Sequence, residues 1–233
     1  MFLLLLVILD TLLIGVISLE VKKNVVFGAS GVVGSNLVNL LKQKKLPYLA
    51  VYRKEATKRE KNKDILEVFD IDKKDIAGAN VFCCIGSSLK KEGSKEKFIE
   101  VELDLVVKLA EFCFTCGCES FNMISCVNAD SGSKIFYAKV KGDLEKKLLA
   151  IGFKKLNIVR PSLLDGKREE FRFLEKLGLI VFKPLGFLFV GPLLQFKPID
   201  VMLVAKCMLH LALFGKNKVN ILQNKEMHRL DRI

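Results

Sequence analysis

Histidine is scarce in this chain, and no arrangement of cysteine and histidine completes a metal site or a disulfide framework. The two histidines, His210 and His228, have no acidic or cysteine partner at a useful spacing, which indicates core or surface positions. The seven cysteines are odd in number and several fall in apolar runs, which favours a reducing compartment. Cys113, Cys116 and Cys118 invite a zinc hypothesis, but they lack a second ligand pair. We therefore predict no metal site.

The chain also lacks repeats, low-complexity stretches and a linker rich in proline, glycine or serine. We therefore expect its 233 residues to hold one globular domain. Basic residues outnumber acidic ones by 38 to 26, but the lysines are scattered rather than gathered on one face with aromatic residues. This distribution indicates a solvated surface and no nucleic-acid partner, while weak attraction to an anionic membrane surface stays open.

The long hydrophobic run is confined to the start of the chain, where residues 1–19 are apolar apart from Asp10, Thr11 and Ser18. No basic residue precedes this run and no small-residue cleavage site follows it, which argues against a cleaved signal. Three interpretations stay open: a membrane anchor, an extension packed on the domain, or a start placed too far upstream. We expect an extension over 1–21, a domain over 22–233, and a cytoplasmic location with membrane association through residues 1–21 as one interpretation.

From residue 24 onwards, short apolar runs alternate with helical patterns. The expected strands are 24–28, 48–52, 65–70, 80–85, 119–125 and 156–160, and the expected helices are 32–44, 98–116, 137–151 and 200–213. This alternation predicts an α/β fold, a Rossmann-type doubly wound parallel sheet. Residues 171–196 are unusually apolar and are interrupted by glycine and proline. We interpret them as a small lid or substrate lobe, with a membrane-contacting surface as the alternative.

A glycine-dense turn follows the first expected strand and precedes the first expected helix. It runs Gly28-Ala29-Ser30-Gly31-Val32-Val33-Gly34. Glycines allow a sharp turn and let backbone N–H groups approach a diphosphate at the positive end of a helix. This turn predicts a dinucleotide site.

Charged residues near two further strand ends bear on the choice of dinucleotide. Arg53 and Lys54 stand where a protein selective for NAD usually places a carboxylate, and two cations suit the 2′-phosphate of NADP(H). Asp70 closes the third expected strand, where a carboxylate can meet the adenine amino group. Gly86 follows the fourth strand and allows close approach of the nicotinamide-side ribose.

Tyr137 and Lys141 form the strongest catalytic pair, because residues four apart share one face of a helix. An ammonium beside a phenol favours the phenolate and lowers the phenol's pKa from its usual value of about 10. Such a phenol can pass a proton to or from a carbonyl or alcohol while hydride moves. Ser125, at the end of the preceding strand, can orient the substrate oxygen.

Taken together, these residues resemble the atypical short-chain dehydrogenase/reductases, specifically the Tat-interacting-protein (CC3-type) oxidoreductase family. The motifs that carry the resemblance are Gly28–Gly34, Arg53-Lys54, Phe82–Ser88, Gly117–Asn122, Asn128–Asp130, Tyr137–Glu145, Val159–Ser162 and Ile221–His228. The resemblance implies an NAD(P)-binding Rossmann domain that holds NADP(H). It implies diphosphate contacts from Ser30, Gly31, Val32 and Val33, 2′-phosphate contacts from Arg53 and Lys54, ribose contacts from Ile85 and Gly86, nicotinamide contacts from Tyr137 and Lys141, and further cofactor contacts from Leu164 and Arg172.

The chain departs from the family in two places. Ser125-Cys126 stands where the family often has two serines, and a thiol is a poorer hydrogen-bond donor than a hydroxyl. The apolar start of the chain is the second departure. Three functions stay open: an NADP(H)-dependent oxidoreductase acting on a small-molecule carbonyl or alcohol, an NADP(H)-sensing protein that signals to a protein partner with little turnover, or a membrane-tethered protein with a vestigial site.

Overall fold

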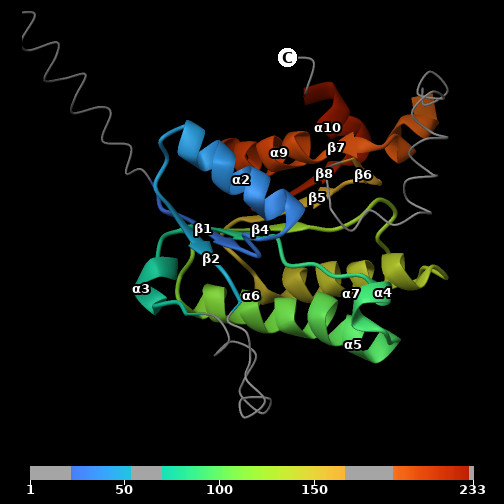
Figure 1. Cartoon of the computed structure of the whole chain (residues 1–233), viewed down its shortest axis with the longest axis horizontal. Helices are drawn as coiled ribbons and strands as arrows, with labels where there is room; N and C mark the ends of the chain where they lie inside the picture. Colours follow the sequence, from blue (N-terminus) through green and yellow to red (C-terminus); the bar gives the residue numbers. More distant parts are fainter. Residues whose placement is uncertain (1–21, 54–69, 166–190, 231–233) are drawn as a thin grey trace, which may run out of the picture.

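The computed structural model describes residues 22–53, 70–165 and 191–230, and these form a three-layer α/β sandwich (Figure 1). Six parallel strands make the central sheet in the order β2-β1-β3-β4-β5-β8. Their bounds are β1 Asn24–Phe27, β2 Tyr48–Val51, β3 Asn80–Cys83, β4 Ser120–Ile124, β5 Leu156–Arg160 and β8 Val219–Gln223. The predicted doubly wound parallel sheet is confirmed.

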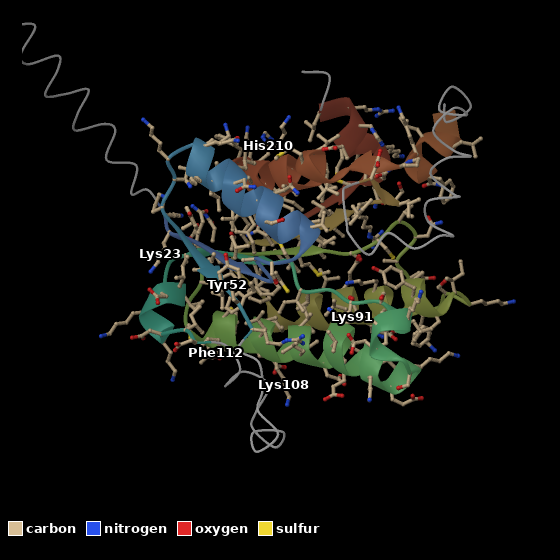
Figure 2. All side chains as sticks on the ribbon, viewed as in Figure 1. Lys23, Tyr52, Lys91, Lys108, Phe112 and His210 are labelled. Atoms are coloured by element: carbon tan, nitrogen blue, oxygen red, sulfur yellow. The ribbon has the colours of Figure 1, made fainter. Side chains whose placement is uncertain are left out.

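Helices cover both faces of the sheet. On one face lie α2 (Val32–Gln43) and α9 (Val201–Phe214), and on the other lie α6 (Leu105–Thr115) and α7 (Phe136–Ile151), as Figure 1 shows. The shorter helices are α3 (Lys73–Ile76), α4 (Leu89–Glu92), α5 (Lys95–Ile99), the π-helical turn η2 (Glu100–Asp104), the 3₁₀ helix η4 (Gly191–Phe196) and α10 (Asn224–Leu230). The helical layers are marked in Figure 2 by His210 on α9 and by Lys108 and Phe112 on α6.

The four inner strands β1, β3, β4 and β5 are buried almost throughout, as expected for a parallel sheet between helices. In β1, Val25 and Phe27 join the core under α6 and α7, while Val26 faces the core under α2 and α9. Alternation along each strand therefore sends successive side chains into two separate cores.

Two expectations for the chain fall partly or wholly outside the described residues. Of the expected strand 65–70, only Asp70 lies within the described residues. Of the expected lid over 171–196, only the residues of η4 do. A small two-stranded parallel sheet, β6 (Leu164–Asp165) with β7 (Ile199–Asp200), flanks that region. The division between 1–21 and 22–233 stays a prediction, because residues 1–21 are also outside the described part.

The strand order places a switch point between β1 and β3. From β1 the chain crosses to β2 on one side, and the next described strand, β3, lies on the other side of β1. Ligands of open α/β sheets bind outside the carboxyl ends of the strands at such a point.

Candidate functional site

The glycine turn after β1 is shaped by close backbone packing. Gly28 has φ +74°, and a Cβ there would lie 2.7 Å from the carbonyl carbon of Cys84. A Cβ on Gly34 would lie 2.2 Å from the carbonyl oxygen of Gly28. These two glycines let α2 start directly against β1 and the loop after β3.

The start of α2 fits a dinucleotide diphosphate. Gly31 is the N-cap, no side chain makes a capping hydrogen bond, and the first turn holds no acidic residue. The first amides of a helix have no intrahelical partner and carry partial positive charge. Ser30 is exposed, Gly31 and Val32 are half-buried, and Val33 is buried.

Of the other predicted cofactor residues, Arg53 and Leu164 follow the carboxyl ends of strands β2 and β5, Asp70 precedes α3, and two lie outside the described residues. Arg53 is exposed two residues after β2, Asp70 is exposed before α3, and Leu164 is half-buried in β6. Lys54 and Arg172 lie outside the described residues. The structure therefore brings Arg53 to the same edge of the sheet as the glycine turn.

The loop after β3 starts beside the glycine turn. The Cys84 amide donates to the carbonyl oxygen of Phe27 (N···O 2.9 Å), which continues the pairing of β3 with β1. Ile85 is half-buried, Gly86 is exposed and Ser87 follows. These residues border the switch point, where the sequence places the nicotinamide-side ribose.

Tyr137 and Lys141 lie one turn apart near the start of α7, as predicted from their spacing. Tyr137 is 41% exposed, whereas Lys141 is only 4% exposed. The Lys141 Nζ lies 6.0 Å from the centre of the Tyr137 ring and donates to the carbonyl oxygen of Ile124 (3.3 Å). Phe98 packs against the Tyr137 ring at a centroid distance of 5.9 Å.

Sequence reasoning missed Glu102, the partner of Lys141. Its Oε2 lies 2.6 Å from the Lys141 Nζ, and its Oε1 accepts a hydrogen bond from the Ser87 amide. Burial opposes the charge on Lys141, but the attraction of Glu102, aided by Tyr137, raises the lysine's pKa above its usual value. The available signal was a carboxylate on the apolar face that Phe98 and Leu105 also occupy.

Ser125 is buried within a second polar cluster. Its hydroxyl donates to the Glu145 carboxylate, which also binds Arg160 (Nε···Oε1 3.0 Å, Nη2···Oε2 2.5 Å). The neighbouring Cys126 is buried, and this burial raises the pKa of its thiol to about 11. At neutral pH Cys126 is thus a protonated thiol beside the engaged Ser125 hydroxyl.

Gly142 was also missed, although it sets the position of α7. A Cβ there would lie 2.2 Å from the carbonyl carbon of Asp130 and 2.3 Å from the Ser131 amide nitrogen. The helix that carries Tyr137 and Lys141 therefore packs backbone to backbone against the loop after β4.

These features match a family of known proteins. The model of the NAD dependent epimerase/dehydratase family matches residues 24–142, from β1 into α7. The chain belongs to this family. Protein HTATIP2 of Rattus norvegicus is 31% identical over 220 residues, covering 90% of this chain and 89% of that protein. The mitochondrial protein FMP52 of Coccidioides immitis is 27% identical over 234 residues, covering 89% of this chain and 95% of that protein. The resemblance seen in the sequence is thereby confirmed.

Solved structures agree on the fold. MoeE5 in complex with UDP-glucose and NAD gives a TM-score of 0.58 at 13% identity, over 88% of this chain and 79% of that one. RMD from Pseudomonas aeruginosa, complexed with NADPH, gives 0.56 at 14% identity, over 91% of this chain and 82% of that one. Both nucleotides therefore occur in this fold, which leaves the choice between them to the residues of each chain.

The prediction of a cytoplasmic protein, membrane-associated through residues 1–21, is wrong. The relatives from Coccidioides immitis and Debaryomyces hansenii are named as mitochondrial proteins. Within the described ranges, no helix combines the length and apolar character that crossing a membrane requires.

Proposed function

We propose that the protein is an NADP(H)-dependent oxidoreductase that interconverts a carbonyl and an alcohol on a small molecule. The observation that carries this proposal is the pair on α7, in which the accessible Tyr137 ring lies 6.0 Å from the buried Lys141 Nζ. A phenol open to a ligand beside a buried cation suits proton transfer to or from oxygen. The family description, which names NAD, supports hydride chemistry at this site.

In carbonyl reduction, the bound NADPH would supply a hydride to the carbonyl carbon. Tyr137 donates its hydroxyl proton to the carbonyl oxygen, so that the C=O bond becomes an alcohol with one new C–H and one new O–H bond. The Lys141 ammonium stabilises the phenolate that remains until a proton from solvent restores the phenol. Alcohol oxidation by NADP⁺ runs through the same groups in reverse.

The cofactor would lie across the start of α2. Backbone amides from Ser30 to Val33 would bind the diphosphate, and Gly28 and Gly34 would let strand and helix meet beneath it. Arg53 would bind the 2′-phosphate with Lys54, and Asp70 would meet the adenine. Ile85 and Gly86 would border the nicotinamide-side ribose, with Leu164 and Arg172 adding further contacts.

The test is NADPH consumption across a panel of aldehydes, ketones and quinones, with Tyr137→Phe as the decisive variant. Loss of the proton donor should lower turnover by about 10²- to 10⁴-fold and change NADPH affinity far less, because phenylalanine keeps the ring that borders the nicotinamide. Tyr48→Phe, at the amino end of β2, is the matched control. Wild-type turnover in Tyr137→Phe would contradict the acid/base role.

A second candidate, an NADP(H)-sensing protein with little turnover and a protein partner, is favoured by the state of Ser125. Its hydroxyl is buried and already donates to Glu145, so orienting a substrate requires that bond to break. A rise in melting temperature with NADPH, without consumption of any panel compound, would favour this function. Unchanged melting temperatures with NADPH, NADP⁺, NADH and NAD⁺ would contradict both.

A further inference from the structure

Glu102 is a buried carboxylate that the proposed reaction leaves without a role. It is 1% exposed and joins three parts of the fold: it belongs to the π-helical turn η2, pairs with Lys141 on α7, and accepts from Ser87 in the loop after β3. Burying two charges away from water costs free energy, unless their mutual attraction and further hydrogen bonds offset the loss of hydration. The pair sits beside the predicted nicotinamide position.

We propose that Glu102 is a positioning residue that keeps Lys141 charged beside Tyr137 and holds the Gly86-Ser87 loop in place for the cofactor. This inference deepens the proposed oxidoreductase function and rests on it.

Four titratable groups face Lys141 from the elements packed around it. They are Glu102 from η2, Tyr137 from α7, Cys83 from β3 and Cys126 from the loop after β4. Burial raises the pKa of both thiols to about 11, so both are neutral at pH 7. Glu145, one turn further along α7, is engaged by Arg160. Glu102 therefore supplies the negative charge that outweighs the burial of Lys141.

The second carboxylate oxygen of Glu102 contacts the loop after β3. Oε1 accepts from the Ser87 amide, and a Cβ on Gly86 would lie 3.4 Å from the same atom. The carboxylate thus packs directly beneath the residues expected to meet the ribose. The π-helical turn between α5 and α6 adds a residue to the helical register at this position, and such turns are frequent at functional sites.

Three variants separate charge from contact. Glu102→Gln removes the charge but keeps an amide oxygen able to accept from Ser87, Glu102→Leu removes both, and Glu102→Asp keeps the charge on a shorter side chain. Glu119→Gln is the control, because Glu119 pairs with Lys22 and Lys154 just before β4, at the opposite edge of the sheet.

The first readout needs no cofactor. In protein with ¹³Cε-labelled lysine, the Lys141 signal is assigned by its absence in Lys141→Arg. Without Glu102 the buried ammonium loses its partner, so Lys141 should titrate at least about one pH unit lower in Glu102→Gln than in the wild type and in Glu119→Gln. Equal titration in all three would overturn the inference, whether or not the protein binds NADPH.

The second readout is the pH dependence of NADPH turnover and binding. Lys141 with a lowered pKa loses its charge as the pH rises, so Glu102→Gln should lose activity at an alkaline pH where the wild type and Glu119→Gln stay active. Glu102→Leu should in addition weaken NADPH binding about tenfold. An unshifted alkaline limb in Glu102→Gln overturns the inference.

If Glu102→Gln does not fold, Glu102→Asp decides. Its Lys141 should titrate as in the wild type while NADPH affinity falls, because the shorter carboxylate cannot reach both Lys141 and Ser87. Full NADPH affinity in Glu102→Asp would overturn the role in the loop. Absence of NADPH binding in the wild type would instead remove the proposed function, while the lysine titration still reports on the ion pair.

Discussion

Arg53 is the single side chain on which cofactor choice is expected to depend within the described residues. It is exposed just beyond β2, at the sheet edge that carries the glycine turn. A guanidinium can bind a phosphate through two parallel hydrogen bonds, whereas it gains little from the 2′-hydroxyl of NADH.

Arg53→Ala should therefore weaken NADPH binding by about tenfold or more and leave NADH binding nearly unchanged. Titration of both cofactors by fluorescence or calorimetry measures the two constants. Lys108→Ala removes a cation from the outer side of α6 (Figure 2) and should change neither. Equal losses for NADPH and NADH in Arg53→Ala would show that this residue does not discriminate between them.

Among single residues, the sequence predicted those whose contacts are with near neighbours in the chain. It missed those whose contacts are with residues far away in the sequence. Tyr137 and Lys141 are one helical turn apart, so their proximity follows from their numbers alone. Glu102 meets Lys141 from a different helix, across 39 residues of chain, and a glutamate in a helical pattern ordinarily indicates a solvated face. Glu145 was missed for the same reason. It accepts a hydrogen bond from the Ser125 hydroxyl, which the sequence analysis had expected to orient the substrate oxygen.

Among the elements, helix α7 carries the proposed catalytic pair, and Gly142 sets its position against the loop after β4. Helix propensity alone predicts that Gly142→Ala stabilises the protein by about 1 kcal/mol. The packing predicts a loss of stability instead, because the added Cβ would lie 2.2 Å from the backbone of the neighbouring loop.

We expect Gly142→Ala to destabilise the protein by about 1–3 kcal/mol and to lower turnover by displacing Tyr137. Urea unfolding measures the first effect, and NADPH consumption the second. Gly152→Ala is a useful comparison, since Gly152 has φ +84° with no atom within 4 Å of an added Cβ, so its cost reflects backbone strain alone. A stabilised Gly142→Ala variant would contradict the close packing of α7.

For two of the differences between the predicted and the observed elements, the reason can be identified. The expected helix 98–116 is three segments, α5, η2 and α6, because an apolar periodicity does not reveal one additional residue in a helical turn. Strand β8 has exposed or half-buried residues throughout and pairs only with β5 among the described strands. Because β8 lacks the continuous apolar run of a central strand, the sequence pattern did not predict it.

In the molecule as a whole, the two ends of the parallel strands hold different sets of residues, and we call these ends the carboxyl edge and the amino edge of the sheet. The carboxyl edge holds the glycine turn, Tyr137 and Lys141. The amino edge holds a buried ladder of polar side chains that crosses five strands through Asn24, Asn80, Ser120, Asn122, Asn157 and Asn220, with each neighbouring pair joined by a hydrogen bond. Such a ladder favours one register, because a shift of any strand leaves buried amides without partners.

Asn157 stands in the middle of this ladder, donating to Asn122 (Nδ2···Oδ1 2.6 Å) and accepting from Asn220 (2.8 Å). Asn157→Leu should lower the free energy of unfolding by about 1–3 kcal/mol, since it strands the buried Asn122 oxygen. Asn220→Ala, at the half-buried end, should cost less. NADPH affinity measured well below the melting temperature should stay at the wild-type value in both variants, because the ladder and the glycine turn lie at opposite ends of the strands. A parallel loss of NADPH affinity in Asn157→Leu would mean that register at the amino edge also sets the geometry of the site, and that the two edges cannot be treated as separate.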